Sequence, residues 1–359
     1  MLIDERKWMI GWGVTASCNM KCSFCYSKGV RKDHKDLNLD VLMSFIDRNA
    51  ESIDSVNYGT GENTLSENWF HLLQYVNQRY PAIRQALTTN GSLSQINESK
   101  WSSVMSALDE VDISFDFRDE SSHNNFRGHS MASSWAVKTL EMCRNYNITT
   151  TLVIMGIEET LDLENLDGIF ALAKQYNAFV RINIYRPNNS DNLSILSYHT
   201  LHKSIKHIIN NYKVVSMADP LFSAIVMGKE KVDASGRTSL RILPDGSITP
   251  STYLTEPEWV RANIADANIG SPDFIQNMQK GLSRPVYPPE CENCPVKSLC
   301  GGGAIDRRIL WYGTLLERDP YCPFRNGERP SDWSVNIPYT QGRGPQIHDG
   351  YLPTLIFSP

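Results

Sequence analysis

The chain has 359 residues and a formal net charge of −5 at pH 7. Its composition is that of an ordinary globular protein, its length allows one large domain with a smaller one, and its negative charge argues against a nucleic-acid partner. No apolar run is long enough to span a bilayer, and the start, Met1–Lys7, lacks the apolar core of a secretory signal. The sequence therefore predicts a cytoplasmic protein without a membrane partner.

Short apolar runs alternate with helix-like stretches from about residue 9 to residue 185. We expect six strands, at Met9–Thr15, Ser55–Tyr58, Gln85–Thr89, Val111–Phe117, Thr149–Met155 and Phe179–Tyr185. We expect helices between them, at Leu39–Ala50, Glu67–Tyr80, Lys100–Leu108, Ser134–Tyr146 and Glu164–Tyr176. This alternation is typical of parallel βα units, and six units predict an α/β fold with a partial (β/α)6 barrel.

The second half of the chain is less regular. We expect a helix at Tyr198–Tyr212 and a hairpin that pairs Ser239–Leu243 with Ser247–Thr249 around the turn Pro244-Asp245-Gly246. The tail is polar but ends in the apolar Tyr351–Phe357, so we expect it to dock on the body. The predicted division is a barrel at residues 1–215, a small domain at 216–326 and an extension at 327–359.

Three cysteines, Cys18, Cys22 and Cys25, follow the first predicted strand. The loop after a strand is where parallel barrels carry their chemistry, and clustered cysteines in a reducing compartment are typical metal ligands. Three thiolates can hold three corners of a [4Fe–4S] cluster and leave one iron open to a ligand. The alternative is a structural zinc site, which needs four ligands.

The segment Cys18-Asn19-Met20-Lys21-Cys22-Ser23-Phe24-Cys25 resembles the signature of the radical S-adenosylmethionine (SAM) superfamily, including the aromatic Phe24. The resemblance implies a [4Fe–4S] cluster whose open iron binds the amino and carboxylate groups of SAM. It also implies a flavodoxin- or ferredoxin-type reductant, and reductive cleavage of SAM to a 5′-deoxyadenosyl radical that abstracts a substrate hydrogen.

The turn Gly59-Thr60-Gly61-Glu62 resembles the Gly-Gly-Glu motif that binds the SAM amino group in this superfamily. Gly61 and Glu62 would then bind SAM, with the Glu62 carboxylate against its ammonium. The chain departs from the motif at Thr60, and it has Asn63 where proline is common. The alternative is an ordinary strand-to-helix turn.

Further residues that resemble SAM-pocket positions are Asn90, Ser114, Asp116 and Arg127. Ser114 and Asp116 share one face of a strand, so both could reach SAM or substrate. Arg127 lies in His123-Asn124-Asn125-Phe126-Arg127-Gly128, which resembles a stretch of peptide-modifying members, and would pair with the SAM carboxylate. The alternatives are a local hydrogen bond for Asp116 and a solvated loop position for Arg127.

A second cysteine group comprises Cys291, Cys294, Cys300 and Cys322. Four thiolates alone would also suit zinc. The run resembles the SPASM domain, which carries auxiliary [4Fe–4S] clusters, but Ser251 and Ala304 replace two of its expected cysteines. The resemblance therefore implies a reduced, twitch-like module with one auxiliary cluster and two [4Fe–4S] clusters in all. That cluster would carry electrons or, alternatively, serve only the fold.

The eighth cysteine, Cys143, lies in a helical pattern, where we expect an apolar filler rather than a hydrogen-atom donor. The resemblance implies a radical SAM maturase, a lyase or oxidoreductase, acting on a ribosomally made precursor peptide. No winged-helix domain precedes the first strand, so a separate leader-recognition protein is expected.

The narrower hypothesis is a splicease-like excision of tyramine at a Tyr-Gly site. One alternative is a dehydrogenase or epimerase of an aminoglycoside-type molecule, and another is a non-catalytic iron–sulfur carrier. The sequence identifies no catalytic residue beyond the cofactor ligands.

Overall fold

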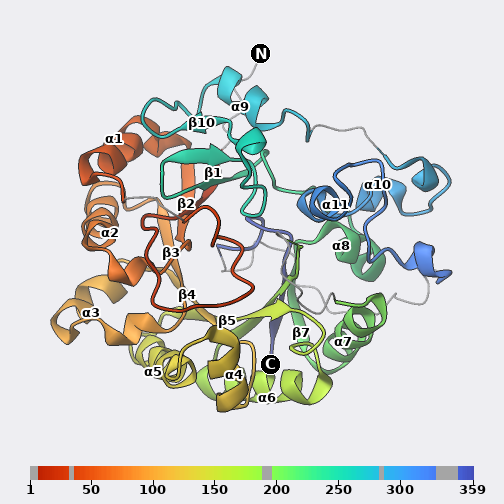
Figure 1. The fold of residues 1–359 in the computed structure, drawn as a ribbon, viewed down its shortest axis with the longest axis horizontal. Coiled ribbons are helices and arrows are strands. Elements are labelled where there is room, and N and C mark those ends of the chain that lie inside the picture. The colour runs from red at the N-terminus through yellow and green to blue at the C-terminus, as the bar shows by residue number, and fades with distance from the viewer. Residues whose placement is uncertain (1–6, 32–35, 188–195, 283–286, 329–346) are drawn as a thin grey trace.

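The computed structural model describes residues 7–31, 36–187, 196–282, 287–328 and 347–359. Six parallel strands form its centre: β1 (Trp8–Trp12), β2 (Ile53–Tyr58), β3 (Arg84–Thr89), β4 (Glu110–Ser114), β5 (Thr149–Gly156) and β6 (Phe179–Ile184). The helices between them are α1 (Leu39–Asn49), α2 (Glu67–Arg79), α3 (Glu98–Met105), α4 (Glu120–Arg127), α5 (Ala132–Asn145) and α6 (Leu163–Tyr176). These helices surround the strands, as in a partial barrel (Figure 1).

The later elements extend this barrel. They are α7 (Tyr198–Asn211), β7 (Lys213–Met217), α8 (Pro220–Met227), β8 (Ser239–Ile242), β9 (Ser247–Thr249), β10 (Ala262–Asn263), α9 (Pro272–Met278), α10 (Lys297–Cys300), α11 (Ile305–Tyr312) and β11 (Leu355–Ser358). The sheet runs in the order β10-β9-β8-β1-β2-β3-β4-β5-β6-β11-β7. β8 pairs in parallel with β1, and β11 lies antiparallel between β6 and β7. Both edges of the six-strand core are thus covered by later parts of the chain.

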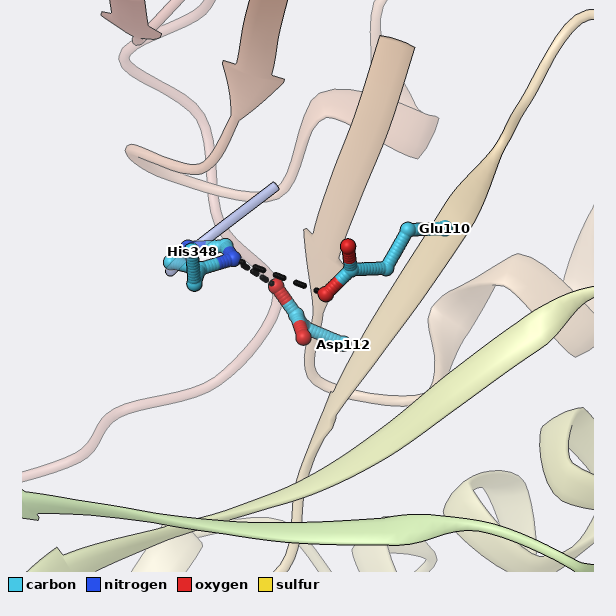
Figure 2. Close-up of side chains that lie close together, drawn as sticks. All are labelled: Glu110, Asp112 and His348. Carbon is cyan, nitrogen blue, oxygen red and sulfur yellow. Dashed lines mark ion pairs between the residues drawn. The ribbon is translucent and has the colours of Figure 1, made fainter. Parts of the chain in front are cut away.

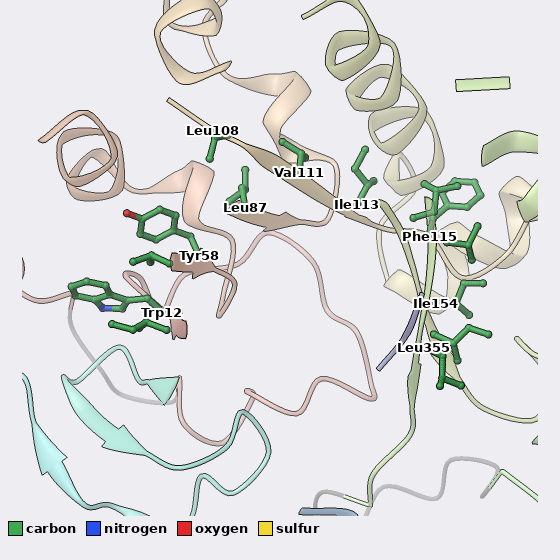
Figure 3. Packing of buried hydrophobic residues seen from close by; sticks show 14 of the residues in the cluster. Trp12, Tyr58, Leu87, Leu108, Val111, Ile113, Phe115, Ile154 and Leu355 are labelled. Atoms are coloured by element: carbon green, nitrogen blue, oxygen red, sulfur yellow. The ribbon is translucent and has the colours of Figure 1, made fainter. Parts of the chain in front are cut away.

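The main hydrophobic core lies between the strands and the outer helices (Figure 3). On β1, Trp8, Ile10 and Trp12 belong to this core, because alternate residues of a strand face the same side. Asn38 and Ser66 cap α1 and α2 through side-chain oxygens that accept a backbone N–H. Local capping and periodic burial therefore both favour the helices that the sequence predicts.

Polar side chains lie on the other side of the strands, where the C-terminal segment is anchored (Figure 2). His348 Nδ1 lies 2.8 Å from an Asp112 oxygen, and His348 Nε2 lies 2.9 Å from Asn57 Nδ2. Arg181 Nη1 lies 3.0 Å from Asp112 as well. Burial opposes the charge of Asp112, yet Arg181 and His348 hold its pKa well below the usual range. Burial and the neighbouring Asp112 raise the pKa of Glu110.

The structure confirms all six predicted strands, the predicted helices and the hairpin, with shifts of a few residues at their ends. It adds elements that the sequence did not predict, namely α4, β7, α8, β10, α9, α10, α11 and β11. The predicted docking of the tail is confirmed for residues 347–359, and residues 329–346 lie outside the described part. Because one sheet runs through all three predicted segments, the domain division stays a prediction. No helix in the described part of the chain is both long and apolar enough to cross a membrane.

Candidate active site

The loop between β1 and α1 carries the three predicted cluster cysteines, and it lies across the sheet in Figure 1. Their side chains line one cavity together with residues from the carboxyl ends of the parallel strands. The predicted site residues that line this cavity are Cys18, Cys22, Phe24, Cys25, Gly61, Asn90, Ser114 and Arg127. Glu62 and Asp116 lie behind the cavity wall rather than in it.

Two glycines let the cysteine loop pack closely on its neighbours. Gly61 has a φ of +67°, and a Cβ there would lie 2.6 Å from the carbonyl oxygen of Ser17. Gly128 has a φ of +65°, and a Cβ there would lie 2.9 Å from the carbonyl oxygen of Lys21. Only glycine adopts this backbone conformation at little cost. The turn after β2 and the end of α4 therefore hold the cysteine loop in place.

The departure at Thr60 is accommodated locally. A Cβ on Gly13 would lie 2.5 Å from the Thr60 Cβ, so Gly13 leaves the space that the threonine fills. The Tyr26 hydroxyl donates to the Gly59 carbonyl at 3.1 Å and lies 3.4 Å from the Thr60 hydroxyl. The threonine is thus part of the packing under the cysteine loop.

The Glu62 carboxylate joins the turn after β2 to the end of β3. It accepts hydrogen bonds from the Thr64 hydroxyl at 2.7 Å, the Thr89 hydroxyl at 3.0 Å and the Asn90 backbone N–H at 2.8 Å. Burial raises its pKa. These bonds use both of its oxygens within the protein, so its role against the SAM ammonium stays a prediction. Asn90 Nδ2, in turn, lies 3.8 Å from the sulfur of Cys18.

Arg127 is a buried helix residue rather than a solvated loop residue. It lies in the last turn of α4, is 9% exposed, and donates from Nε to Asp116 at 2.7 Å. The other Asp116 oxygen accepts from the backbone N–H of Met155 at 2.9 Å. Asp116 therefore orients the guanidinium that faces the cavity. The sulfur of Cys22 lies 3.4 Å from the Arg127 carbonyl oxygen.

Cations and aromatic rings flank the three thiols. Burial raises the pKa of Cys18 to about 11, and it raises the pKa of Cys22 against the opposing charge of Arg127. Arg31 Nη2 lies 3.6 Å from the sulfur of Cys25. Sequence analysis missed Arg31, whose signal was its place six residues after Cys25. Phe24 stacks on the ring of Phe126, with 4.2 Å between the ring centres.

The cysteine sulfurs are not arranged as a preformed zinc site. Four sulfurs bound to one zinc at about 2.3 Å lie roughly 3.8 Å apart. Among the described residues, no three cysteine sulfurs lie within 4.8 Å of one another. A cubane holds its thiolates on separate irons, and therefore farther apart.

The second cysteine group lies beside α8 and α10. Cys291, Cys294, Cys300 and Cys322 line one small cavity, and all except Cys294 are buried. Burial raises the pKa of Cys322 to about 11, which favours the protonated thiol in the absence of a metal. The structure thus brings together the four residues that the sequence groups.

Polar contacts occupy the positions of the two cysteines that the resemblance leads us to expect. The Ser251 hydroxyl donates to Asp306 at 3.1 Å, and Arg186 Nε donates to the other oxygen of Asp306 at 2.8 Å. The backbone N–H of Ala304 donates to Asp319 at 3.2 Å. An ion pair and hydrogen bonds therefore stand where a full SPASM domain would have thiolates.

The sequence did not predict one wall of the cavity. It includes Asn183 and Arg186 at the end of β6, together with Tyr26 and Tyr253. The signal was the barrel rule, which places functional side chains at the carboxyl end of every strand. Cys143 lies fully buried in the core on α5, which confirms the predicted filler, and burial raises its pKa to about 12.

Comparison with known proteins agrees with this geometry. Residues 12–167 match the model of the Radical SAM superfamily. The mycofactocin maturase MftC of Mycolicibacterium smegmatis is 23% identical over 87% of this chain and 81% of its own length. The AdoMet-dependent heme synthase of Methanosarcina barkeri is 23% identical over 89% of this chain and 97% of its own length.

Solved structures show the same fold. The structure of anSMEcpe with bound AdoMet and Cp18Cys peptide has a TM-score of 0.72 and 19% identity, and the match covers 91% of this chain and 96% of that one. Streptococcus suis SuiB bound to S-adenosylmethionine has a TM-score of 0.68 and 14% identity, and the match covers 89% and 77%. The chain therefore has the α/β fold of these radical SAM proteins, and its match to the Radical SAM superfamily model covers residues 12–167.

Proposed function

We propose that this protein is a radical SAM enzyme that modifies a ribosomally made precursor peptide. The observation that carries the proposal is a single cavity lined by the cysteine trio and by SAM-motif residues from several strand ends. A [4Fe–4S] cluster with bound SAM supplies, on reduction, a 5′-deoxyadenosyl radical that takes a hydrogen atom from the substrate. The superfamily implies both cofactors, and a donor set of three cysteines that line one cavity fits them.

The roles of the residues follow from their positions. Cys18, Cys22 and Cys25 would each bind one iron of the cluster. Arg127, oriented by Asp116, would hold the SAM carboxylate through a charge-assisted hydrogen bond. Apolar side chains on the cavity wall would keep water away from a reactive radical; they are Met20, Phe24, Val153 and Met155.

A peptide substrate is supported by the similar proteins. One solved structure carries the Cp18Cys peptide, and another shows SuiB bound to the precursor peptide SuiA. MftC is named as a maturase. We therefore favour a precursor peptide, presented by a separate recognition protein, with an electron from a flavodoxin- or ferredoxin-type reductant.

The second cysteine group supports a further part of the proposal. Four cysteines around one enclosed cavity would bind an auxiliary [4Fe–4S] cluster with no open iron. Such a cluster suits electron transfer better than substrate binding. The polar contacts of Ser251 and Ala304 leave no thiolates at those two positions for another cluster.

The test uses the reconstituted enzyme with SAM and dithionite. Peptides encoded by short genes beside its own would be offered with deuterium at each residue in turn. We expect deuterium in 5′-deoxyadenosine for one labelled residue. A Tyr-Gly peptide that loses tyramine would support the splicease hypothesis. SAM cleavage that responds to an aminoglycoside precursor and to none of the peptides would contradict a peptide substrate.

A further inference from the structure

The cavity wall at the end of β6 carries an unpaired donor and an unpaired acceptor. Asn183 lies on β6, and Arg186 follows the strand by two residues. Among the described residues that line the cavity, Asn183 Oδ1 and Arg186 Nη2 are the two buried side-chain atoms without a hydrogen-bond partner. Buried polar groups in proteins are nearly always paired, so this pair marks a place for a ligand.

The contacts of Arg186 hold its guanidinium in one orientation. Nε donates to Asp306 at 2.8 Å, and Nη1 donates to the carbonyl oxygen of Ile184 at 2.7 Å. The guanidinium carbon lies 4.5 Å from the centre of the Tyr253 ring. The second Asp306 oxygen accepts from Ser251. Nη2 is therefore a fixed donor without an acceptor from the described part of the protein.

Charge balance indicates a neutral ligand group. The described residues that line the cavity include two cations, Arg127 and Arg186. Arg127 is the residue assigned above to the SAM carboxylate, and the Asp306 carboxylate neutralises Arg186. A substrate carboxylate would therefore find no further cation there. The described residues that line the cavity include no aspartate or glutamate, so an ammonium of an amino sugar would find no carboxylate there. A group with one donor, one acceptor and no charge matches the pair.

We propose that Asn183 and Arg186 hold one peptide group of the substrate. Its N–H donates to Asn183 Oδ1, and its carbonyl oxygen accepts from Arg186 Nη2. This inference rests on the proposed function and narrows its substrate class to a peptide whose backbone enters the cavity. The network of Ser251, Asp306 and Arg186 then positions the substrate at a place where a full SPASM domain would have a cluster ligand.

The experiment uses the reconstituted, SAM-bound enzyme and three probes. They are Ac-Tyr-Gly-NH2 and its two versions in which one backbone N–H, of Tyr or of Gly, is replaced by an ester oxygen. Binding is measured by saturation-transfer NMR. We expect one ester version to bind the native enzyme roughly three- to tenfold more weakly than the amide. Asn183→Leu should abolish this difference, because the acceptor is gone.

Two further variants are measured in the same experiment, one as a matched control and one that removes the proposed donor. Thr151→Val is the matched control, since Thr151 on β5 also has a buried, unpaired oxygen among the described residues but does not line the cavity. It should retain the amide-to-ester difference. Arg186→Met should weaken the amide and the esters by a similar factor. Iron content and thermal unfolding show whether each variant folds.

Three results would overturn the inference: no saturable binding of any probe, equal binding of all three probes, or an amide-to-ester difference that persists in Asn183→Leu. Binding of 2-deoxystreptamine that displaces the peptide would also overturn it, in favour of a sugar substrate. Failure of the proposed function is distinguishable, because the native enzyme would then form no 5′-deoxyadenosine or would form it in response to an aminoglycoside precursor and to none of the peptides.

Discussion

The two cysteine groups of this chain differ in access. Cys18, Cys22 and Cys25 are all partly exposed and line a cavity with ten or more strand-end residues around it, whereas Cys291, Cys300 and Cys322 are buried around a small enclosed space. Guanidinium groups lie beside both groups, from Arg31 and Arg127 at the first and from Arg318 at the second. The difference teaches that the same chain places one cysteine group at an accessible cavity and the other in an enclosed one, as the proposed roles of a reactive cluster and an electron-transfer cluster would require.

The largest effect is expected at Cys18, Cys22 and Cys25, which we call the open group. Cys25→Ala would remove one of the three cysteine ligands proposed for the reactive cluster, so iron content should fall by about four atoms per chain and SAM cleavage should disappear. Iron assay and detection of 5′-deoxyadenosine measure both. Cleavage at the native rate in this variant would show that the trio is not the reactive site.

The second cysteine group, Cys291, Cys294, Cys300 and Cys322, which we call the closed group, should respond differently. Cys300→Ala should also lower iron content by about four atoms per chain, but some SAM cleavage should remain while product is lost. The same two assays apply, with product followed by mass spectrometry. Equal loss of SAM cleavage in the Cys25 and Cys300 variants would erase the contrast and indicate that the second cluster serves folding.

A smaller effect is expected from the backbone that holds the open group. Gly61→Ala places a methyl group 2.6 Å from the Ser17 carbonyl oxygen and forces alanine into a left-handed conformation at a cost of about 1–2 kcal/mol. SAM cleavage should therefore fall roughly tenfold. Gly29→Ala in the same loop is the control, since a Cβ there meets no atom within 4 Å. Matching rates in the two variants would contradict the packing argument.

The smallest effect is expected on the stability of the protein at acidic pH. His123 accepts from the backbone N–H of Asp116, and His202 bonds to the Tyr321 carbonyl oxygen beside the closed group. Burial lowers the pKa of each histidine to about 3. The unfolded chain takes up these protons below about pH 6.5, so stability should fall from there towards pH 3. Thermal unfolding against pH should show a shallower fall for His123→Leu, and an unchanged slope would contradict a neutral, buried His123.

The sequence predicts the repeating βα part of the fold, but not the elements whose positions depend on contacts between residues far apart in the chain. Hydrophobic periodicity was sufficient for β1 to β6, because each strand is buried and each helix carries an apolar face. It could not reveal β11, whose pairing with β6 depends on residues about 175 positions apart. Nor could it show that Asp116 serves Arg127, since that contact depends on the unpredicted helix α4.

The candidate site likewise contains residues that the sequence predicts and residues that only the fold brings together. Cys18, Cys22 and Cys25 follow from spacing, because a short loop brings them together whatever surrounds it. Asn183 and Arg186 carry no motif, and they join the site only because β6 ends beside the cysteine loop. Asp306, in the first turn of α11, shows why, because it holds Arg186 from 120 residues away in the sequence.

The most direct test of the central claim is iron content and SAM cleavage in the anaerobically reconstituted native protein. The account predicts about eight irons per chain and formation of 5′-deoxyadenosine once dithionite is added. One tightly bound zinc per chain with no 5′-deoxyadenosine would contradict it.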